Sequence, residues 1–282
     1  MSRPGLDADP LSLGADWFNA LFGEIGIDAE VAGLTAKSIG TGQIGENVRF
    51  VFDYARKGPN APATLVGKFP SDSPESLMTA KLLGHYEREV KFYRTFPKVA
   101  GVITPAAFYT DYDPDTNRFA LIMEDMAPSE QGDQLQGCSV AEAERALSAA
   151  AVLHAAYWND PSLDTHAWLQ GSDLAPPPAL TPEAVSGLWH GFKDRYGERL
   201  EADDILVGDA YATALPAWSE GYDGPHALTH NDFRLDNMLF GADAAPKPLA
   251  VVDWQTAGKG APAGDVAYFI GAGLTREDRP KH

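Results

Sequence analysis

One segment, LTHNDFRLDNMLF at residues 228–240, constrains this chain most, because polar side chains stand between apolar ends. The polar residues are His230, Asp232, Arg234, Asp236 and Asn237. LAVVDWQ, residues 249–255, has the same arrangement in a shorter form, with an apolar run that ends at Asp253. Short apolar runs of this kind predict buried strands. Polar clusters at the ends of two such strands are expected to form the floor of one site.

Composition narrows the classes of protein to which the chain can belong. Its 282 residues suffice for one large domain or for two lobes. A formal net charge of −18 argues against nucleic-acid and anionic membrane partners, which need basic patches. No export signal or membrane-spanning stretch is evident, and the single cysteine, Cys138, excludes an internal disulfide. We therefore expect a cytoplasmic protein.

The first part of the chain is predicted to be rich in strands. Residues 11–26 have the apolar spacing of a short helix, and residues 64–69 and 117–126 have the composition of buried strands. Between them a long helical pattern runs from Pro74 to Phe96. The expected apolar positions are Trp17, Phe18, Leu21 and Phe22 in the first helix, Val48, Phe50, Phe52 and Tyr54 in an alternating strand, and Met78, Leu82, Tyr86, Val90 and Tyr93 in the long helix.

The second part is predicted to be mostly helical. Residues 139–158 begin with a capping box, Ser139 and Glu142, and continue as an alanine-rich helix. His154 in this helix is interpreted as a structural histidine. Residues 184–200 form another helical pattern, and more helix is expected up to Trp218.

A glycine-rich segment precedes the alternating strand. Gly40, Gly42 and Gly45 have the spacing G-x-G-x-x-G, but the segment opens a strand instead of a helix, which argues against a dinucleotide-binding fold. Such a loop between strands can cover the phosphates of a nucleotide with its backbone N–H groups. A plain hairpin turn is the alternative.

Lys68 lies inside an apolar strand, where an unpaired ammonium would cost several kcal/mol. The side chain could reach solvent from an edge strand. The following helix, however, carries Glu89 and Glu87 near its apolar face. A Lys–Glu pair would hold the ammonium where it can contact phosphates. Glu89 is the preferred partner and Glu87 the alternative.

The polar residues of the two late segments suit phosphoryl transfer to a hydroxyl. That reaction needs a carboxylate to orient and deprotonate the acceptor, and hard oxygen ligands for Mg²⁺. Asp232 fits the first role, and Asn237 and Asp253 fit the second. His230 is expected to brace the loop. Any one of these could be a loop cap, but this reading does not account for all of them together with Lys68 and the glycine segment.

Several motifs resemble the aminoglycoside phosphotransferase/choline kinase superfamily over about residues 15 to 275. HNDFRLDNMLF resembles its catalytic loop, VVDWQ its metal segment, and GAPAGDVAYFI the segment that follows. YEREVKFYRTF, LIMEDM, LHAAYW and RLDN most resemble the ecdysteroid-kinase-like and acyl-CoA-dehydrogenase-associated phosphotransferases. The resemblance implies an α+β, protein-kinase-like fold of two lobes. Residues 1–127 would form the β-rich N-lobe and residues 128–282 the mostly helical C-lobe.

The resemblance also implies the cofactors, ATP and Mg²⁺, and the roles of the site residues. Asp232 would be the catalytic base, Lys68 the phosphate-contacting lysine, and Asn237 and Asp253 the metal ligands. Asp265 would brace the catalytic loop.

The segment MEDM would be the hinge in this resemblance. The backbone groups of Glu124 and Met126 would bind adenine, with Met123 as gatekeeper.

Three departures from the family pattern stand out. Asn231 replaces the usual Gly of H-G-D, at a position where protein kinases carry Arg. Gln255 replaces the frequent Glu after D-W, which makes the outer metal environment less acidic. Relatives usually continue for several helices beyond the position of Phe269, so we expect a truncated C-lobe.

The leading hypothesis is a Mg·ATP-dependent kinase that acts on a hydroxyl of a small molecule, of the sterol-like, hydroxyacyl or aminoglycoside type. A non-catalytic nucleotide-binding or scaffold protein of the same fold is the main alternative. A metal-dependent phosphoesterase that uses His230, Asp232 and Asp253 is a third hypothesis, but it leaves Lys68 and the glycine segment without a role.

Overall fold

The computed structural model describes residues 6, 9–40, 45–96, 98–99, 102–170, 182–242, 247–275 and 278–279. By its internal contacts the chain forms two compact units, one of Met1–Pro176 with His226–His282 and one of Pro177–Pro225. In the described part of the chain, no helix is both long enough and apolar enough to cross a membrane.

A five-stranded antiparallel sheet of the first unit has the order β1-β2-β3-β5-β4. Its strands are β1 (Ala29–Ile39), β2 (Gly45–Lys57), β3 (Thr64–Pro70), β4 (Ala107–Asp113) and β5 (Arg118–Glu124). Strands β2, β3 and β5 agree with the predicted apolar segments. Strands β1 and β4 were not predicted. Each has one buried residue, Val31 or Tyr109, among intermediate and exposed positions, so neither shows a clean alternation.

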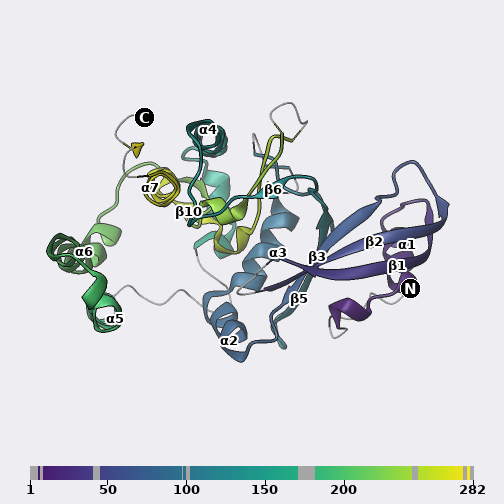
Figure 1. Ribbon diagram of the computed structural model, residues 1–282, viewed down its shortest axis with the longest axis horizontal. Coiled ribbons are helices and arrows are strands. Elements are labelled where there is room, and N and C mark those ends of the chain that lie inside the picture. Colours follow the sequence, from purple (N-terminus) through teal and green to yellow (C-terminus); the bar gives the residue numbers. More distant parts are fainter. Residues whose placement is uncertain are drawn as a thin grey trace. The chain divides into compact units, whose positions relative to one another are not determined.

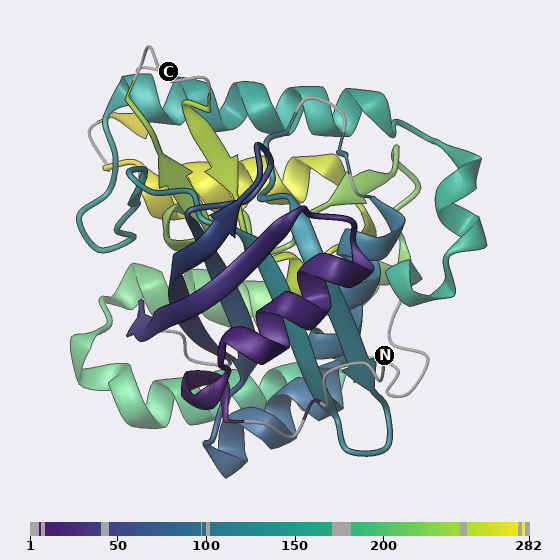
Figure 2. The same cartoon turned by 90° about the vertical axis from the view of Figure 1, so that its right-hand side faces the viewer.

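Helix α1 (Ala15–Glu24), preceded by the short 3₁₀ helix η1 (Pro10–Ser12), lies across one face of this sheet (Figures 1 and 2). Phe18, Leu21 and Phe22 of α1 are buried, as their spacing predicts. They pack against Val48, Phe50 and other side chains of the same face. Because side chains alternate along a strand, Lys68 of β3 lies on the opposite face from its neighbour Phe69, which belongs to this core.

The expected long helix between Pro74 and Phe96 is two helices, α2 (Pro74–Leu83) and α3 (His85–Thr95). The break is at Gly84, whose left-handed backbone (φ 66°, ψ 28°) caps α2 and cannot continue a right-handed helix. Tyr86 of α3 is buried as predicted, whereas Met78 and Leu82 of α2 are exposed. The apolar spacing therefore identifies the packed helix, but it does not predict the change of direction at the glycine.

The rest of the first unit is mostly helical and carries the two late polar segments. Helix α4 (Val140–Ala156) begins with the predicted capping box of Ser139 and Glu142 and lies beside α7 (Pro262–Gly273) (Figure 2). The other elements are β6 (Glu130–Gln131), η2 (Pro161–Thr165), η3 (Ala167–Gln170), β7 (Ala227–Thr229), η5 (Leu235–Asn237), β8 (Met238–Phe240), β9 (Leu249–Val251), η6 (Trp254–Thr256) and β10 (Gly258–Gly260).

The second unit contains α5 (Pro182–Tyr196), η4 (Gly197–Arg199) and α6 (Ala202–Glu220), which agrees with the helical pattern of this stretch. The two long helices contact each other. The indole N–H of Trp189 and the ammonium of Lys193 both donate to Asp209, at 2.6 and 2.7 Å.

Candidate active site

Strands β8 and β9 bring the two late polar segments together. They pair antiparallel, with Met238 opposite Val251. The Val252 N–H donates to the carbonyl of Asn237 at 2.9 Å, which extends the pairing by one step. Asn237 directly precedes β8, and Asp253 lies two residues beyond β9. The two predicted metal ligands therefore lie at the same end of one hairpin.

Asp265 of α7 fixes the start of the loop at residues 230–237. Its two carboxylate oxygens accept hydrogen bonds from the backbone N–H groups of His230 and Asn231, at 2.9 and 2.8 Å. His154 of α4 contacts the same carboxylate at 3.0 Å. Asp265 is 2% exposed. The contact between Asp265 and the loop is the one that the motif predicts, and His154 supports it from behind.

His230 and Asn231 shape the backbone of this loop. The Val252 carbonyl only accepts hydrogen bonds, so Nε2 of His230 carries the proton in their 3.0 Å contact. Nδ1 of His230 then accepts from the Asp232 N–H at 3.3 Å. Asn231 has φ 64°, in the left-handed region that glycine and asparagine tolerate best. This backbone explains why asparagine can replace the glycine of the family pattern.

Asp232 presents its carboxylate near the surface of the site, with the side chain 23% exposed. The Asn237 side-chain N–H donates to Asp232 Oδ2 at 2.8 Å and to its carbonyl at 2.9 Å. Arg234 contacts the same carboxylate, at 3.1 Å from Oδ1. The carboxylate is thus held in one orientation and remains accessible.

Lys68 joins the sheet to the late polar segments. Its ammonium lies 2.8 Å from Glu89 of α3 and 2.8 Å from Asp253. The predicted Lys68–Glu89 pair is therefore present, and Glu87 pairs instead with Lys91 at 2.7 Å. The Lys68 and Glu89 side chains are 10% and 1% exposed. Strand β3, helix α3 and the segment after β9 therefore meet at this ammonium.

The pKa values of this group follow from burial and mutual attraction. Burial disfavours the Lys68 ammonium, but Asp253 and Glu89 outweigh it and raise its pKa. Burial also opposes ionisation of Asp253, yet Lys68 outweighs it and lowers the pKa of that carboxyl. Burial raises the pKa of Glu89. The ionised form of Asp253 is therefore the favoured one in this group, whereas Glu89 is shifted toward its neutral form.

The donor set suits Mg²⁺. Asp253 offers a carboxylate that is 29% exposed on its side chain. The Asn237 amide nitrogen donates to Asp232, so its amide oxygen is the atom that could serve as a ligand. Hard oxygen ligands from one or two protein side chains, completed by phosphates and waters, are typical of Mg²⁺ sites. The described residues contain no cluster of three or more His, Cys, Asp or Glu side chains that could hold a metal ion.

The glycine-rich segment lies between the antiparallel strands β1 and β2, and residues 41–44 of it are outside the described part of the chain. Gly40 has φ 73°, and Gly45 begins β2. A Cβ on Gly45 would lie 2.9 Å from the Phe69 carbonyl and 3.4 Å from Cε of Lys68, so only glycine fits this close approach. Gly42 lies outside the described residues.

The predicted hinge follows β5. The Glu124 N–H already donates to the Ala106 carbonyl at 2.8 Å. The Met126 carbonyl accepts from Ser129, and no described residue accepts a hydrogen bond from the Met126 N–H. Met123 is buried opposite Val66 of β3. The binding of adenine by the Glu124 and Met126 backbone groups stays a prediction.

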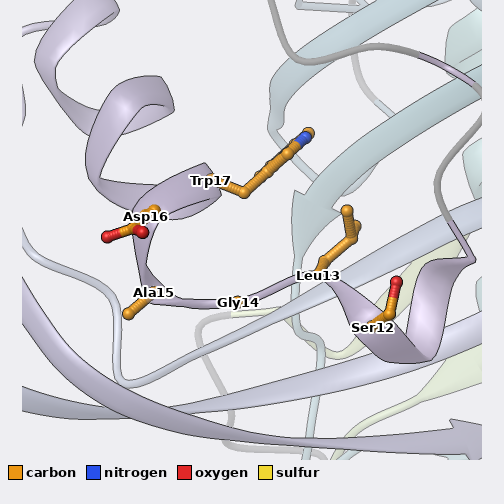
Figure 3. A pocket seen from close by; sticks show the side chains of 6 residues that line it. All are labelled: Ser12, Leu13, Gly14, Ala15, Asp16 and Trp17. Carbon is orange, nitrogen blue, oxygen red and sulfur yellow. The ribbon is translucent and has the colours of Figure 1, made fainter.

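A hollow of about 410 Å³ lies between η1 and α1, lined by Leu13, Trp17 and their neighbours (Figure 3). It is on the α1 side of the sheet, whereas Lys68 faces the other side. It contains none of the predicted site residues.

Two residues that contact the site were not assigned to it from sequence. Arg234 is an ion-pair partner of Asp232, and its only signal was its place inside the polar segment. His154 was interpreted as structural, and the structure shows that what it supports is Asp265.

The family model of the phosphotransferase enzyme family matches residues 50–281, and the chain belongs to this family. The predicted superfamily is thereby confirmed, and with it a phosphotransferase class of enzyme. No curated protein matches the sequence significantly.

Solved structures of other phosphotransferases share the fold. The chain is similar to wild-type aminoglycoside 2'-phosphotransferase-IIIa in its GDP complex, with 17% identity over 91% of this chain and 77% of that one, and a TM-score of 0.53. The GDP and kanamycin complex of APH(2'')-IIIa is 17% identical over 92% of this chain and 78% of that one, with a TM-score of 0.55. An ethanolamine kinase from Plasmodium vivax is 12% identical over 91% of this chain and 68% of that one, with a TM-score of 0.53. These likenesses confirm the predicted α+β, kinase-like fold.

Proposed function

We propose that this protein is a Mg·ATP-dependent kinase that transfers the γ-phosphoryl group of ATP to a hydroxyl of a small molecule. The observation that carries the proposal is the contact of Lys68 with Glu89 and Asp253, beside the loop that holds Asp232 and Asn237. Family membership supports the reaction class. GDP in the solved relatives supports a nucleotide as the donor.

The donor side is formed by the sheet and the metal segment. The Met126 N–H would bind the adenine edge, and the glycine-rich segment with Gly40 and Gly45 would cover the phosphates. Lys68 would contact the phosphates while Glu89 keeps its ammonium in place. Asp253 and Asn237 would hold Mg²⁺, which when bound neutralises phosphate charge.

The acceptor side is formed by Asp232. Its carboxylate would accept the proton of the acceptor hydroxyl as the acceptor oxygen bonds to the γ-phosphorus. The bond from that phosphorus to the bridging oxygen of ADP breaks in the same transfer. Because the Asp232 carboxylate is already oriented by Asn237 and Arg234, catalysis rests mainly on positioning and electrostatics.

The class of acceptor follows from motif resemblance. The RLDN form of the loop is similar to that of ecdysteroid-kinase-like and acyl-CoA-dehydrogenase-associated phosphotransferases, which favours a sterol-like or hydroxyacyl alcohol. A cationic aminoglycoside, such as the kanamycin bound by one solved relative, suits the net charge of −18. The cytoplasm, where ATP is available, is the compartment that we propose.

Thermal unfolding with ATP, with and without Mg²⁺, tests the donor site. At a hundredfold excess over Kd, binding adds about 2.7 kcal/mol of stability, and Tm should rise by roughly 3 °C or more. We expect Asp253→Ala to lose the Mg²⁺-dependent part of the rise. Asp28→Ala, which removes a remote and exposed carboxylate, should keep it. No rise in the wild-type protein would contradict the proposal.

Asp232→Ala separates binding from transfer. It should retain the Mg·ATP-dependent rise in Tm and lose transfer to any acceptor that the wild-type protein phosphorylates. If the variant transferred phosphate at the wild-type rate, Asp232 would not be the base.

A further inference from the structure

Arg234 joins two carboxylates of the loop at residues 230–237. Its Nε lies 3.1 Å from Oδ1 and 3.2 Å from Oδ2 of Asp232. Its Nη1 forms a close ion pair with Asp236 Oδ2. The Arg234 side chain is 29% exposed, which places it at the rim of the site. One guanidinium therefore spans from the proposed base to a second acid.

Asp236 is itself anchored from outside the loop. Its Oδ1 accepts a hydrogen bond from the Gln134 N–H at 2.9 Å, and its carbonyl accepts from the Gln131 side chain at 2.6 Å. The Gln134 side chain accepts in return from the Leu235 N–H at 3.1 Å. The segment after the hinge thus holds Asp236, and the other oxygen of Asp236 holds Arg234.

Asn237 and Arg234 both contact the Asp232 carboxylate, and the Tyr268 hydroxyl of α7 interacts with it as well. Asn237 donates to Oδ2, and Arg234 contacts both oxygens. Asn237 has a further task as a proposed metal ligand, whereas Arg234 has no role in the donor site. A planar guanidinium donates from several nitrogens held at fixed spacing and angle, a geometry that the single nitrogen of a lysine ammonium does not reproduce.

We propose that Arg234, held in place by Asp236, is a positioning residue for phosphoryl transfer, which directs the Asp232 carboxylate toward the attacking oxygen. The inference deepens the proposed kinase function and rests on it. Misplacing a catalytic group by a small distance slows the chemical step strongly. The contacts proposed for ATP lie at Lys68, Met126 and the glycine-rich segment. Loss of Arg234 should therefore lower kcat and leave the KM for ATP nearly unchanged.

The test uses the whole chain and Mg·ATP, with water as the acceptor, so that no natural acceptor is needed. Steady-state ATP hydrolysis is measured for the wild-type protein, Arg234→Ala, Arg234→Lys, Asp236→Asn and the double variant Arg234→Ala/Asp236→Asn. Arg56→Ala is the matched control, because Arg56 is an exposed arginine at the far end of the β1–β2 hairpin. Thermal unfolding with Mg·ATP reports binding for every variant.

We expect Arg234→Ala to lower kcat at least about tenfold, with a KM for ATP within about threefold of the wild type. Low concentrations of free guanidinium should restore part of its activity, which would not happen if the variant were misfolded. The kcat of Arg234→Lys should lie between those of the wild-type protein and Arg234→Ala. Asp236→Asn should lower kcat less than Arg234→Ala, and the double variant should be no slower than Arg234→Ala, because the two residues act in series.

Three results would overturn the inference. They are a wild-type kcat for Arg234→Ala or Arg234→Lys, a loss in Arg234→Ala that guanidinium does not relieve, and losses for Arg234 and Asp236 that simply add. Each leaves the kinase proposal intact as long as the wild-type protein hydrolyses Mg·ATP. A wild-type protein that neither binds nor hydrolyses Mg·ATP would remove the kinase proposal, and the role of Arg234 with it.

Discussion

Two residues of the candidate site depart from ordinary backbone geometry, and both lie where a strand runs into a polar loop. Asn231 has φ 64° and Asp253 has φ 63°, in the left-handed region. Such a backbone costs of order 1 kcal/mol or more for a residue other than glycine. Hydrogen bonds from Asn231 to Asp265 and to the Thr256 carbonyl, and the contact of Asp253 with Lys68, hold both residues in place. The kinks direct Asp232 and Asp253 toward one site.

His85, the first residue of α3, is a buried ionisable group that the proposed chemistry does not use. It is 8% exposed, and its Nδ1 has no hydrogen-bond partner among the described residues. Burial lowers the pKa of His85 to about 4, although the nearby Asp253 carboxylate favours its charged form. The neutral imidazole is therefore the form that the fold accommodates.

Stability should consequently fall in mild acid. In the unfolded chain His85 has its ordinary pKa of 6.5, so between pH 6.5 and about 4 the unfolded state binds the proton more readily. Linkage predicts that the unfolding free energy falls by about 2 kcal/mol from about pH 7 to about pH 5 because of His85. Urea unfolding at both pH values should show this loss for the wild-type protein and a smaller one for His85→Gln. The exposed His190→Gln should behave as the wild type, and equal losses in all three proteins would contradict the assignment.

Helices α4 and α7 act on the loop as a pair, through His154 and Asp265. In Asp265→Ala, the buried N–H of His230 and the partly buried N–H of Asn231 lose their acceptor. Each unsatisfied buried group costs roughly 1–3 kcal/mol, so we expect a loss of about 3 kcal/mol or more in urea unfolding, together with loss of phosphoryl transfer. His154→Ala should give a smaller loss of stability.

Asp113→Ala is the control for the Asp265→Ala variant. Asp113 also accepts two hydrogen bonds, from the Asp115 N–H and the Thr116 hydroxyl, but in an exposed turn between β4 and β5. Its removal should cost about 1 kcal/mol at most. A similar cost for Asp265→Ala would mean that the loop does not depend on α7.

Helices and strands that pack in the core are predicted from the sequence better than strands at the edges of the sheet. Strong apolar patterns predicted α1, α3 and the central strands. Edge strands β1 and β4 were missed, since each buries only one residue fully and has an irregular register, so that neither shows a clean alternation. The break at Gly84 was missed because glycine is compatible with either a helix or its end.

At the candidate site, spacing along the chain predicted that Asp232, Asn237 and Asp253 lie together, and the β8–β9 hairpin accounts for this proximity. The Lys68–Glu89 pair could be predicted because a lysine in an apolar strand requires a partner. Arg234 could not be assigned, because its pairing with Asp232 and Asp236 depends on side-chain directions that a loop sequence does not reveal. The same holds for His154, whose partner lies on another helix.

The first unit as a whole contains two separate hydrophobic cores, and both stabilise it. One packs α1 against the outer face of the five-stranded sheet and includes Phe18 and Phe50. The other runs from α3 through the late segments to α4 and α7, and includes Phe92 and Trp254. In this second core the rings of Phe92 and Trp254 stack with centroids 4.1 Å apart at 6°. Trp254 directly follows Asp253, so this core supports the metal segment from behind.

The two cores should therefore respond differently to the same loss of volume. Phe18 and Phe92 are both fully buried, and replacing either with alanine should cost about 3–5 kcal/mol of unfolding free energy. Phe92→Ala also removes the ring against which Trp254 stacks, so Asp253 should lose its fixed place beside Lys68 and Mg·ATP should bind more weakly. Phe18→Ala should bind Mg·ATP as the wild type does, because α1 packs on the face of the sheet opposite Lys68. Calorimetric titration well below the Tm of each variant measures this difference. Equal affinities in the two variants would show that the position of Asp253 does not depend on the core behind it.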